Sequence, residues 1–220
     1  SIPSCSWFAS GASVEMRWNA AQVLLEERLA DGKCLVFVNG KEDADQGATL
    51  LDTYFRNRRF LVGVAALHGD MDQSMRQNVL RRFKKGEISV LVATDVAARG
   101  LDLPDVHTVL VLEAGRSTDT HVHRVGRTGR LSKDGGGERR QGSAFTFLRR
   151  GRDEHFARTL AQSFQRAGRP TPPSLLFGGS ASDAGGHQQE KANFVPAHRR
   201  EPPSQPPGFR PSALKPPAAA

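Results

Sequence analysis

The sequence predicts an α/β fold in which a parallel sheet carries helices on both faces. Short apolar runs rich in β-branched residues alternate with longer segments whose apolar residues recur at helical spacing. A regular strand–helix–strand succession requires crossover connections, and crossovers join parallel strands. The chain of 220 residues is long enough for one such domain with an additional segment.

The predicted strands are short apolar runs bounded by turn residues, which is typical of strands buried on both faces. They cover residues 34–39, 61–69, 90–95, 108–114 and 143–148.

Helices are predicted before the first strand, between strands and after the last one, over residues 14–30, 42–60, 72–86 and 152–168. Their core-facing residues are predicted to be Ala44, Leu50, Leu51, Tyr54 and Phe55 in the second helix, Met75, Val79, Leu80 and Phe83 in the third, and Phe156, Leu160 and Phe164 in the last.

The composition changes near residue 170. Most of the 13 prolines lie in 171–220, among Gly, Ala, Ser and Gln, and such a segment buries too little apolar surface to offset the entropy of ordering. We therefore expect a globular domain over 14–170, a Pro/Gly/Ala-rich disordered tail over 171–220, and a leader or interdomain linker over 1–13. Because residue 1 is Ser, we also expect the chain to be part of a longer protein.

The formal net charge of +8 indicates a polyanionic partner. No apolar run has the length of a membrane span, and the first residues lack the order of a signal peptide, so we expect an intracellular protein with no membrane partner. The two cysteines, Cys5 and Cys34, form neither a disulfide framework nor a CxxC metal site.

Polar residues follow the predicted strands where each one ends. Asn39 ends the first strand and Gly40 follows it, Thr94 and Asp95 end the third, and "HVHRVGRTGR" (121–130) follows the fourth. Ligands of parallel α/β sheets bind at the carboxyl ends of the strands, so these residues are predicted to share one edge. No GxxxxGK[ST] phosphate loop occurs, which indicates that the chain cannot hydrolyse ATP alone.

The start of the helix predicted over 72–86 suits a phosphate group. Free backbone amides and the positive end of the helix dipole favour anions there. Gln73 and Arg76 are three residues apart and share one face, whereas Asp72 is expected to be the helix cap.

Histidines at 121 and 123 are not expected to bind zinc, because an HxH spacing within a helix directs the two side chains apart. We predict no metal site in this chain.

The segments "HGDMDQSMRQNVLRRFKKG", "VLVATDVAARGLDLPDV" and "HVHRVGRTGR" together resemble the second RecA-like domain of DEAD-box RNA helicases, over about residues 14–165. The resemblance implies a RecA-like fold and the C-terminal half of an ATP-dependent RNA helicase that acts in RNA processing. "HGDMDQS" and "DTHVHR" resemble the subgroup associated with the splicing factor SF3b, which implies ribonucleoprotein partners and favours the nucleus over the cytoplasm.

The resemblance also implies how ATP is used. ATP with Mg²⁺ is expected to be held mainly by the N-terminal RecA-like domain of the same protein, and Arg127 and Arg130 are the expected arginine fingers, on one side of a helical turn. Asp102 is expected at the ribose. The residues expected to contact ATP or the other domain are Arg99, His123, Arg124 and Gly126. A local salt bridge that holds the loop is the alternative for Arg99, His123 and Arg124.

For RNA, the resemblance implies backbone contacts with little sequence specificity. The expected contacts are Gln73, Arg76, Thr94 and Gly100, with Asn39 and Gly40 as further contacts.

The sequence departs from the family pattern at three places. Glu113-Ala114-Gly115 replaces an Asn-aromatic-Asp string, which predicts looser packing under the arginine fingers; residues 132–141 are a predicted flexible insertion; and His121 replaces a residue that is commonly tyrosine.

The alternative function is a non-catalytic RNA-binding or scaffold module that retains the helicase fold. The chemistry-bearing residues matched above argue against it, because a scaffold has no need for arginine fingers.

Overall fold

The computed structural model describes the backbone of residues 4–9, 13–98, 106–129, 142–149, 151–171 and 175, all within the compact unit Ser1–Gly179; the second unit, Ser180–Ala220, lies outside the described residues. The strands are β1 (Ser4–Ala9), β2 (Cys34–Phe37), β3 (Val64–Leu67), β4 (Val90–Ala93), β5 (Thr108–Val111) and β6 (Ser143–Leu148). The helices are α1 (Val14–Arg28), α2 (Lys41–Asn57), α3 (Gln73–Lys85), α4 (Asp95–Ala98), α5 (Thr118–Val125) and α6 (Glu154–Arg166).

The strands form one 6-stranded sheet in the order β1-β6-β5-β2-β4-β3, and every pair is parallel. Central strands β2, β4 and β5 are buried at every position, as expected for strands covered on both faces. The predicted α/β architecture is confirmed.

Strand β1 was not predicted, because its residues lie in the segment 1–13 that we expected to be a leader or linker. Ser4–Ala9 pairs in parallel with β6, from Ser4 opposite Ser143 to Ala9 opposite Leu148. This pairing uses backbone groups at the edge of the sheet, and the residues of β1, SCSWFA, include none of the β-branched residues that mark a strand in a sequence.

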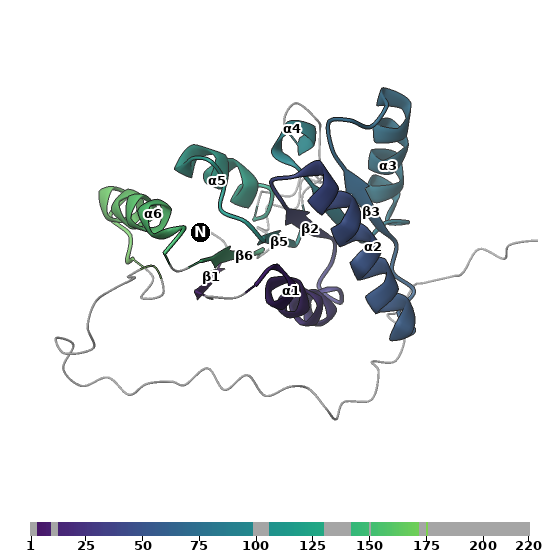
Figure 1. The fold of residues 1–220 in the computed structure, drawn as a ribbon, viewed down its shortest axis with the longest axis horizontal. Helices are drawn as coiled ribbons and strands as arrows, with labels where there is room; N and C mark the ends of the chain where they lie inside the picture. Colours follow the sequence, from purple (N-terminus) through teal and green to yellow (C-terminus); the bar gives the residue numbers. More distant parts are fainter. Residues whose placement is uncertain are drawn as a thin grey trace, which may run out of the picture. The chain divides into compact units, whose positions relative to one another are not determined.

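Helices cover both faces of the sheet. On one face, α1 and α2 pack with Val36, Val92 and Leu110, whereas on the other face α3 and α5 pack with Leu35 and Val109. Figure 1 shows α5 and α6 on the side of the sheet opposite α1. No helix in the described part of the chain combines the length and apolar character needed to cross a membrane.

Most of the predicted inward-facing residues are buried or half-buried in this core. Leu50 and Met75 are exceptions, since both are exposed on their helices. The predicted boundary at residue 170 also needs correction, because Leu175 is only 1% exposed and packs with Leu148 and Leu160 of the α6 cluster. An apolar side chain that covers a helix belongs to the domain whatever the composition around it.

Gly47 determines how closely α1 and α2 pack. A methyl group at this position would lie 2.1 Å from Cη2 of the Trp18 ring, which is too close for any two carbon atoms. Trp18 itself is buried in the core below α2. The indole of Trp18 therefore occupies the space that a side chain at position 47 would need.

We predict that Gly47→Ala destabilises the domain by about 1–3 kcal/mol through overpacking, although alanine would favour an open helix position by about 1 kcal/mol. The measurement is the free energy of unfolding in urea. Gln46→Ala, at an exposed neighbouring position, is the control and should change stability by less than about 0.5 kcal/mol. A Gly47→Ala variant more stable than the parent would show that Trp18 moves aside.

Candidate nucleotide and nucleic-acid interface

The carboxyl ends of neighbouring strands bring polar residues together at one edge of the sheet, as the sequence predicted. Asp45 of α2 contacts His68, which follows β3, with 3.1 Å between Oδ1 and Nε2. Lys41, also on α2, forms an ion pair with Asp70 in the loop before α3. These contacts join the start of α2 to the loop after β3.

Arg124 of α5 connects three strand ends. Its guanidinium donates hydrogen bonds to both carboxylate oxygens of Asp95, at 2.7 and 2.6 Å. It also donates to the backbone carbonyl of Glu113 at 2.7 Å and to Oδ1 of Asn39 at 2.8 Å. Its Cζ lies 5.3 Å from the centre of the Phe37 ring. One side chain thus holds the ends of β2, β4 and β5 against α5.

The Arg124 side chain is only 1% exposed, so its charge is compensated inside the domain. A planar guanidinium can satisfy a carboxylate and two neutral acceptors at once, which an ammonium group cannot do in the same geometry. Of the two roles considered for Arg124, the local salt bridge is present in the structure. A contact of Arg124 with another domain stays a prediction.

Glu113 takes part in the same network through its side chain as well as its carbonyl. Its carboxylate accepts a hydrogen bond from the backbone N–H of Asn39 at 3.1 Å and lies 3.7 Å from Nη1 of Arg17. Arg17 on α1 is 3% exposed and donates to the Leu112 carbonyl at 2.8 Å. The departure from the family string at Glu113 therefore brings its own ion pair, and looser packing under the arginine fingers stays a prediction.

Arg17 is a residue that the sequence reasoning missed. Burial, and then the charge of Arg149, lowers the pKa of its guanidinium. A signal for it exists in the sequence, because Arg17 stands four and eight residues before Ala21 and Leu25, on the apolar side of its helix.

The first turn of α3 presents Gln73 and Arg76 together. Gln73 is exposed, Arg76 is half-buried, and Nη1 of Arg76 lies 3.4 Å from Oε1 of Gln73. Asp72 occupies the N-cap position, as predicted, but within the described residues its side chain makes no capping hydrogen bond. Thr94 directly follows β4 and is buried, and its N–H donates a hydrogen bond to the Leu67 carbonyl. Gly40 is the N-cap of α2.

The loop that follows α5 leaves the helix sooner than expected. Gly126 is the C-cap, Thr128 forms a bridge with Val106, and Gly129 has a positive φ of 71°. The Thr128 hydroxyl also donates to the His107 carbonyl at 2.7 Å. These contacts give residues 126–129 a non-helical path where a helical turn was expected. Arg130 lies outside the described residues, so the placement of the two arginine fingers relative to each other stays a prediction.

Arg127 lies within this loop. The side chain is half-buried, the N–H donates to the Arg124 carbonyl at 3.2 Å, and the carbonyl accepts from the Val106 N–H at 3.1 Å. The two backbone bonds fix the position of Arg127 relative to Arg124 and to Val106. Arg130, Asp102, Arg99 and Gly100 lie outside the described residues, so their predicted roles stay predictions.

The two histidines of the HVH string have different surroundings. His123 is exposed, whereas His121 is 3% exposed and packs edge-on against Phe156 of α6, with 5.6 Å between ring centres. Burial, and then the nearby charge of Arg124, lowers the pKa of His121 to about 4. His121 is thus a neutral packing residue between α5 and α6. Within the described ranges no three His, Cys, Asp or Glu side chains are placed to hold a metal ion.

Comparison with known proteins places this arrangement in a family. Residues 17–132 match the model of the helicase conserved C-terminal domain. The mouse (Mus musculus) ATP-dependent RNA helicase DDX42 is 42% identical over 160 residues, which are 73% of this chain and 16% of that protein. The chain thus spans about a sixth of the length of this curated relative.

Solved structures agree with the family match. The RNA helicase Prp28 from Chaetomium thermophilum bound to ADP superimposes with a TM-score of 0.64 and 28% identity, over 80% of this chain and 40% of that one. Domain 2 of the DEAD-box helicase Mss116p, bound to an RNA duplex, gives a TM-score of 0.54 and 28% identity, over 72% and 58%. The chain belongs to the helicase conserved C-terminal domain family, and it is similar to domain 2 of DEAD-box helicases.

We predict that Arg124→Met destabilises the domain by about 3–5 kcal/mol, because it leaves Asp95 and three strand ends without their shared partner. Arg56→Met is the matched control, since Arg56 is exposed and pairs with Asp52 at 2.9 Å on the surface of α2. Its loss should cost less than about 1 kcal/mol. Urea unfolding of both variants is the measurement, and equal losses would contradict a central role for Arg124.

His121 should make stability depend on pH. The folded-state pKa of about 4 lies below the ordinary value of 6.5, so the unfolded chain binds more protons between these two values. Stability is therefore lost as the pH falls from about 6.5 towards 4, by about 2–3 kcal/mol at pH 4.5.

The test compares the unfolding free energies of the parent and His121→Phe at pH 7.5 and 4.5. The phenylalanine keeps the ring against Phe156 and should remove this part of the acid sensitivity. His123→Gln, at an exposed position, should retain it. The same loss of stability on acidification in the parent and in His121→Phe would show that another group is responsible.

Proposed function

We propose that this chain is the C-terminal half of an ATP-dependent RNA helicase that hydrolyses ATP together with an N-terminal RecA-like domain of the same protein. In this proposal the N-terminal domain holds ATP and Mg²⁺, and the present chain closes over the nucleotide. The names of the curated relatives and the ADP-bound Prp28 structure support the use of ATP.

Arg127 and Arg130 are proposed as the arginine fingers. Phosphoryl transfer spreads negative charge over the transferred oxygens, and a preorganised guanidinium stabilises that charge. Preorganisation at Arg127 is supported by its backbone, which is bonded on one side to Arg124 and on the other to Val106. Asp102 is proposed to accept hydrogen bonds from the ribose, with Arg99, His123 and Gly126 near the interface between the domains.

RNA is proposed to bind at the first turn of α3. The observation that carries this part is the contact between Gln73 and Arg76, which presents an amide and a guanidinium side by side next to helix amides that favour phosphate. Thr94, Gly100, Asn39 and Gly40 lie on the proposed continuation of this surface. The RNA-bound structure of Mss116p domain 2 supports the assignment.

The Arg124 network suggests how the two halves of the site are joined. Arg124 precedes the proposed finger Arg127 by three residues, and its partner Asp95 directly follows Thr94, a proposed RNA contact. A shift of the finger loop on nucleotide binding would therefore act directly on the end of β4. Ribonucleoprotein partners and a nuclear location complete the proposal, on the resemblance to the splicing subgroup.

We predict that Arg127→Ala, in the protein that carries both RecA-like domains, lowers RNA-stimulated ATP hydrolysis by at least about 100-fold, because the finger charge is lost. Steady-state phosphate release at saturating RNA is the measurement. Arg116→Ala removes an exposed arginine from the loop before α5 and should leave the rate within about twofold of the parent.

Unchanged turnover in Arg127→Ala would remove its finger role. If the parent protein binds RNA but hydrolyses no ATP, the scaffold function would replace the enzymatic one.

A further inference from the structure

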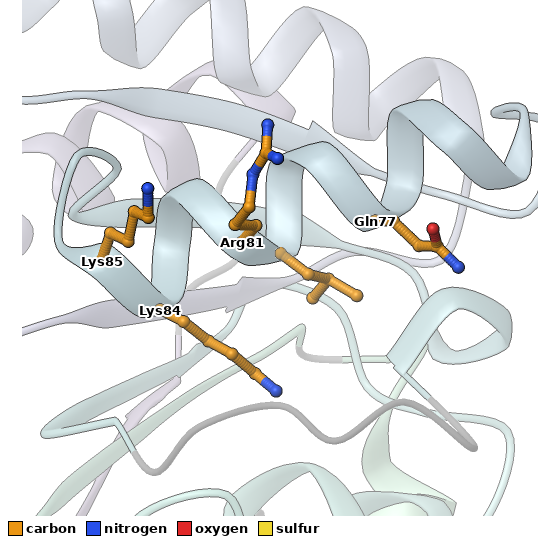
Figure 2. Close-up of a pocket in the computed structure, with 5 residues that line it drawn as sticks. Gln77, Arg81, Lys84 and Lys85 are labelled. Atoms are coloured by element: carbon orange, nitrogen blue, oxygen red, sulfur yellow. The ribbon is translucent and has the colours of Figure 1, made fainter.

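Helix α3 carries an unusual concentration of positive charge. Its basic residues are Arg76, Arg81, Arg82, Lys84 and Lys85, and it contains no acidic residue. Gln77, Arg81, Lys84 and Lys85 border a shallow pocket of about 460 Å³ whose floor includes the buried Leu80. Figure 2 shows the four polar side chains projecting from the helix around this pocket. We call the five residues that line this pocket, Gln77, Leu80, Arg81, Lys84 and Lys85, the α3 basic face.

Helix stability accounts for only part of this charge. Cations in the last turn interact favourably with the helix dipole, by about 0.3–1 kcal/mol each, but Arg81 precedes that turn. The last turn already has Lys33, whose ammonium donates to the Lys84 carbonyl at 2.8 Å. Arg82 points to another side of the helix and pairs with Glu87 at 3.3 Å. The α3 basic face therefore holds more charge than the end of the helix requires.

Among the described residues, Arg81 and Lys85 have no carboxylate partner for their charges. Both side chains are exposed, and in the part of the chain that the structure describes no carboxylate lies within ion-pair distance of either. Instead, Nη2 of Arg81 donates a hydrogen bond to Oδ1 of Asn78 at 2.8 Å, which orients the guanidinium. An exposed guanidinium oriented by a neutral amide remains able to bind an anion.

The α3 basic face continues from the proposed RNA contacts. Gln73, Gln77 and Lys84 are separated by four and seven residues, which places them along one side of the helix. The 13 residues of α3 extend over about 20 Å, a distance spanned by roughly six stacked nucleotides. A strand held at Gln73 and Arg76 can thus reach Lys84 and Lys85 along the same helix.

We propose that the α3 basic face binds the sugar–phosphate backbone of the RNA segment that flanks the nucleotides held at Gln73 and Arg76, an inference that rests on the proposed function. Arg81, Lys84 and Lys85 contact phosphates, Gln77 bridges to the first turn, and the apolar floor at Leu80 packs against a ribose. The contacts are to the backbone, so they add affinity and site length without sequence preference.

An acidic peptide is the competing ligand for such a surface. The alignment of the α3 basic face with Gln73 and Arg76 favours RNA, because a phosphate backbone bound at those two residues continues along the helix, whereas a peptide does not need to lie along the proposed phosphate contacts.

The test uses the 220-residue chain and single-stranded poly-uridine of about 5 and about 12 nucleotides, with fluorescence anisotropy at several salt concentrations. Arg81→Gln/Lys84→Gln/Lys85→Gln should weaken the 12-mer about tenfold and leave the 5-mer within about twofold. The slope of log Kd against log salt for the 12-mer should fall by about 2, since each lost phosphate contact on a single strand contributes about 0.7.

Two controls define the result. Arg158→Gln/Arg166→Gln/Arg169→Gln removes the same charge from exposed positions on and after α6 and should leave binding of both lengths unchanged. Arg76→Ala should weaken both lengths by the same factor, because it removes a contact that each oligonucleotide makes.

If the triple α3 variant binds the 12-mer like the parent while Arg76→Ala weakens it, the inference is wrong and the proposed RNA site stands. If Arg76→Ala has no effect on either length, the proposed RNA site fails, and the inference fails with it. If a Glu-rich peptide, and not the 12-mer, loses affinity in the α3 variant, the surface binds protein and the inference is overturned.

Discussion

The buried guanidinium of Arg124 is the constraint on which the candidate site depends. Asp95, Asn39 and Glu113 each follow a different strand, and only a planar cation with several N–H donors can meet their three acceptors at distances of 2.6–2.8 Å. A buried ion pair of this kind adds little net stability compared with an apolar core. Displacing one partner is nevertheless strongly destabilising, because it leaves the other charge buried and uncompensated. The loops at this edge are therefore held in one arrangement.

The domain carries two kinds of positive charge. Arg17 and Arg124 are buried and compensated by Glu113 and Asp95, so they shape the surface without contributing to it. The exposed cations of the α3 basic face lie beside β3 and β4, at the opposite end of the sheet from β6. Net charge alone does not distinguish these groups, which is why the excess of +8 said little about where an anion binds.

Local periodicity was sufficient to predict five of the six strands, their parallel direction and the edge at which polar residues gather. Contacts between distant segments were not predictable in this way: the pair of Arg17 and Glu113 joins residues that are 96 positions apart, and no pattern around either one names the other. The path after Gly126 was also missed, because it depends on the Thr128 hydroxyl reaching the His107 carbonyl. Motif spacing located Gln73 and Arg76 correctly, since both belong to one turn of helix.

The contact between His121 and Phe156 has a consequence for where the domain ends. Phe156 belongs to α6, the last helix of the described residues, so the imidazole on α5 is kept from water by a segment that follows all three motifs of the family resemblance. A shortened protein cut before residue 154 would keep every motif and yet uncover His121, and the proton-binding equilibrium of an imidazole three residues from Arg124 would then move back towards that of a solvated side chain.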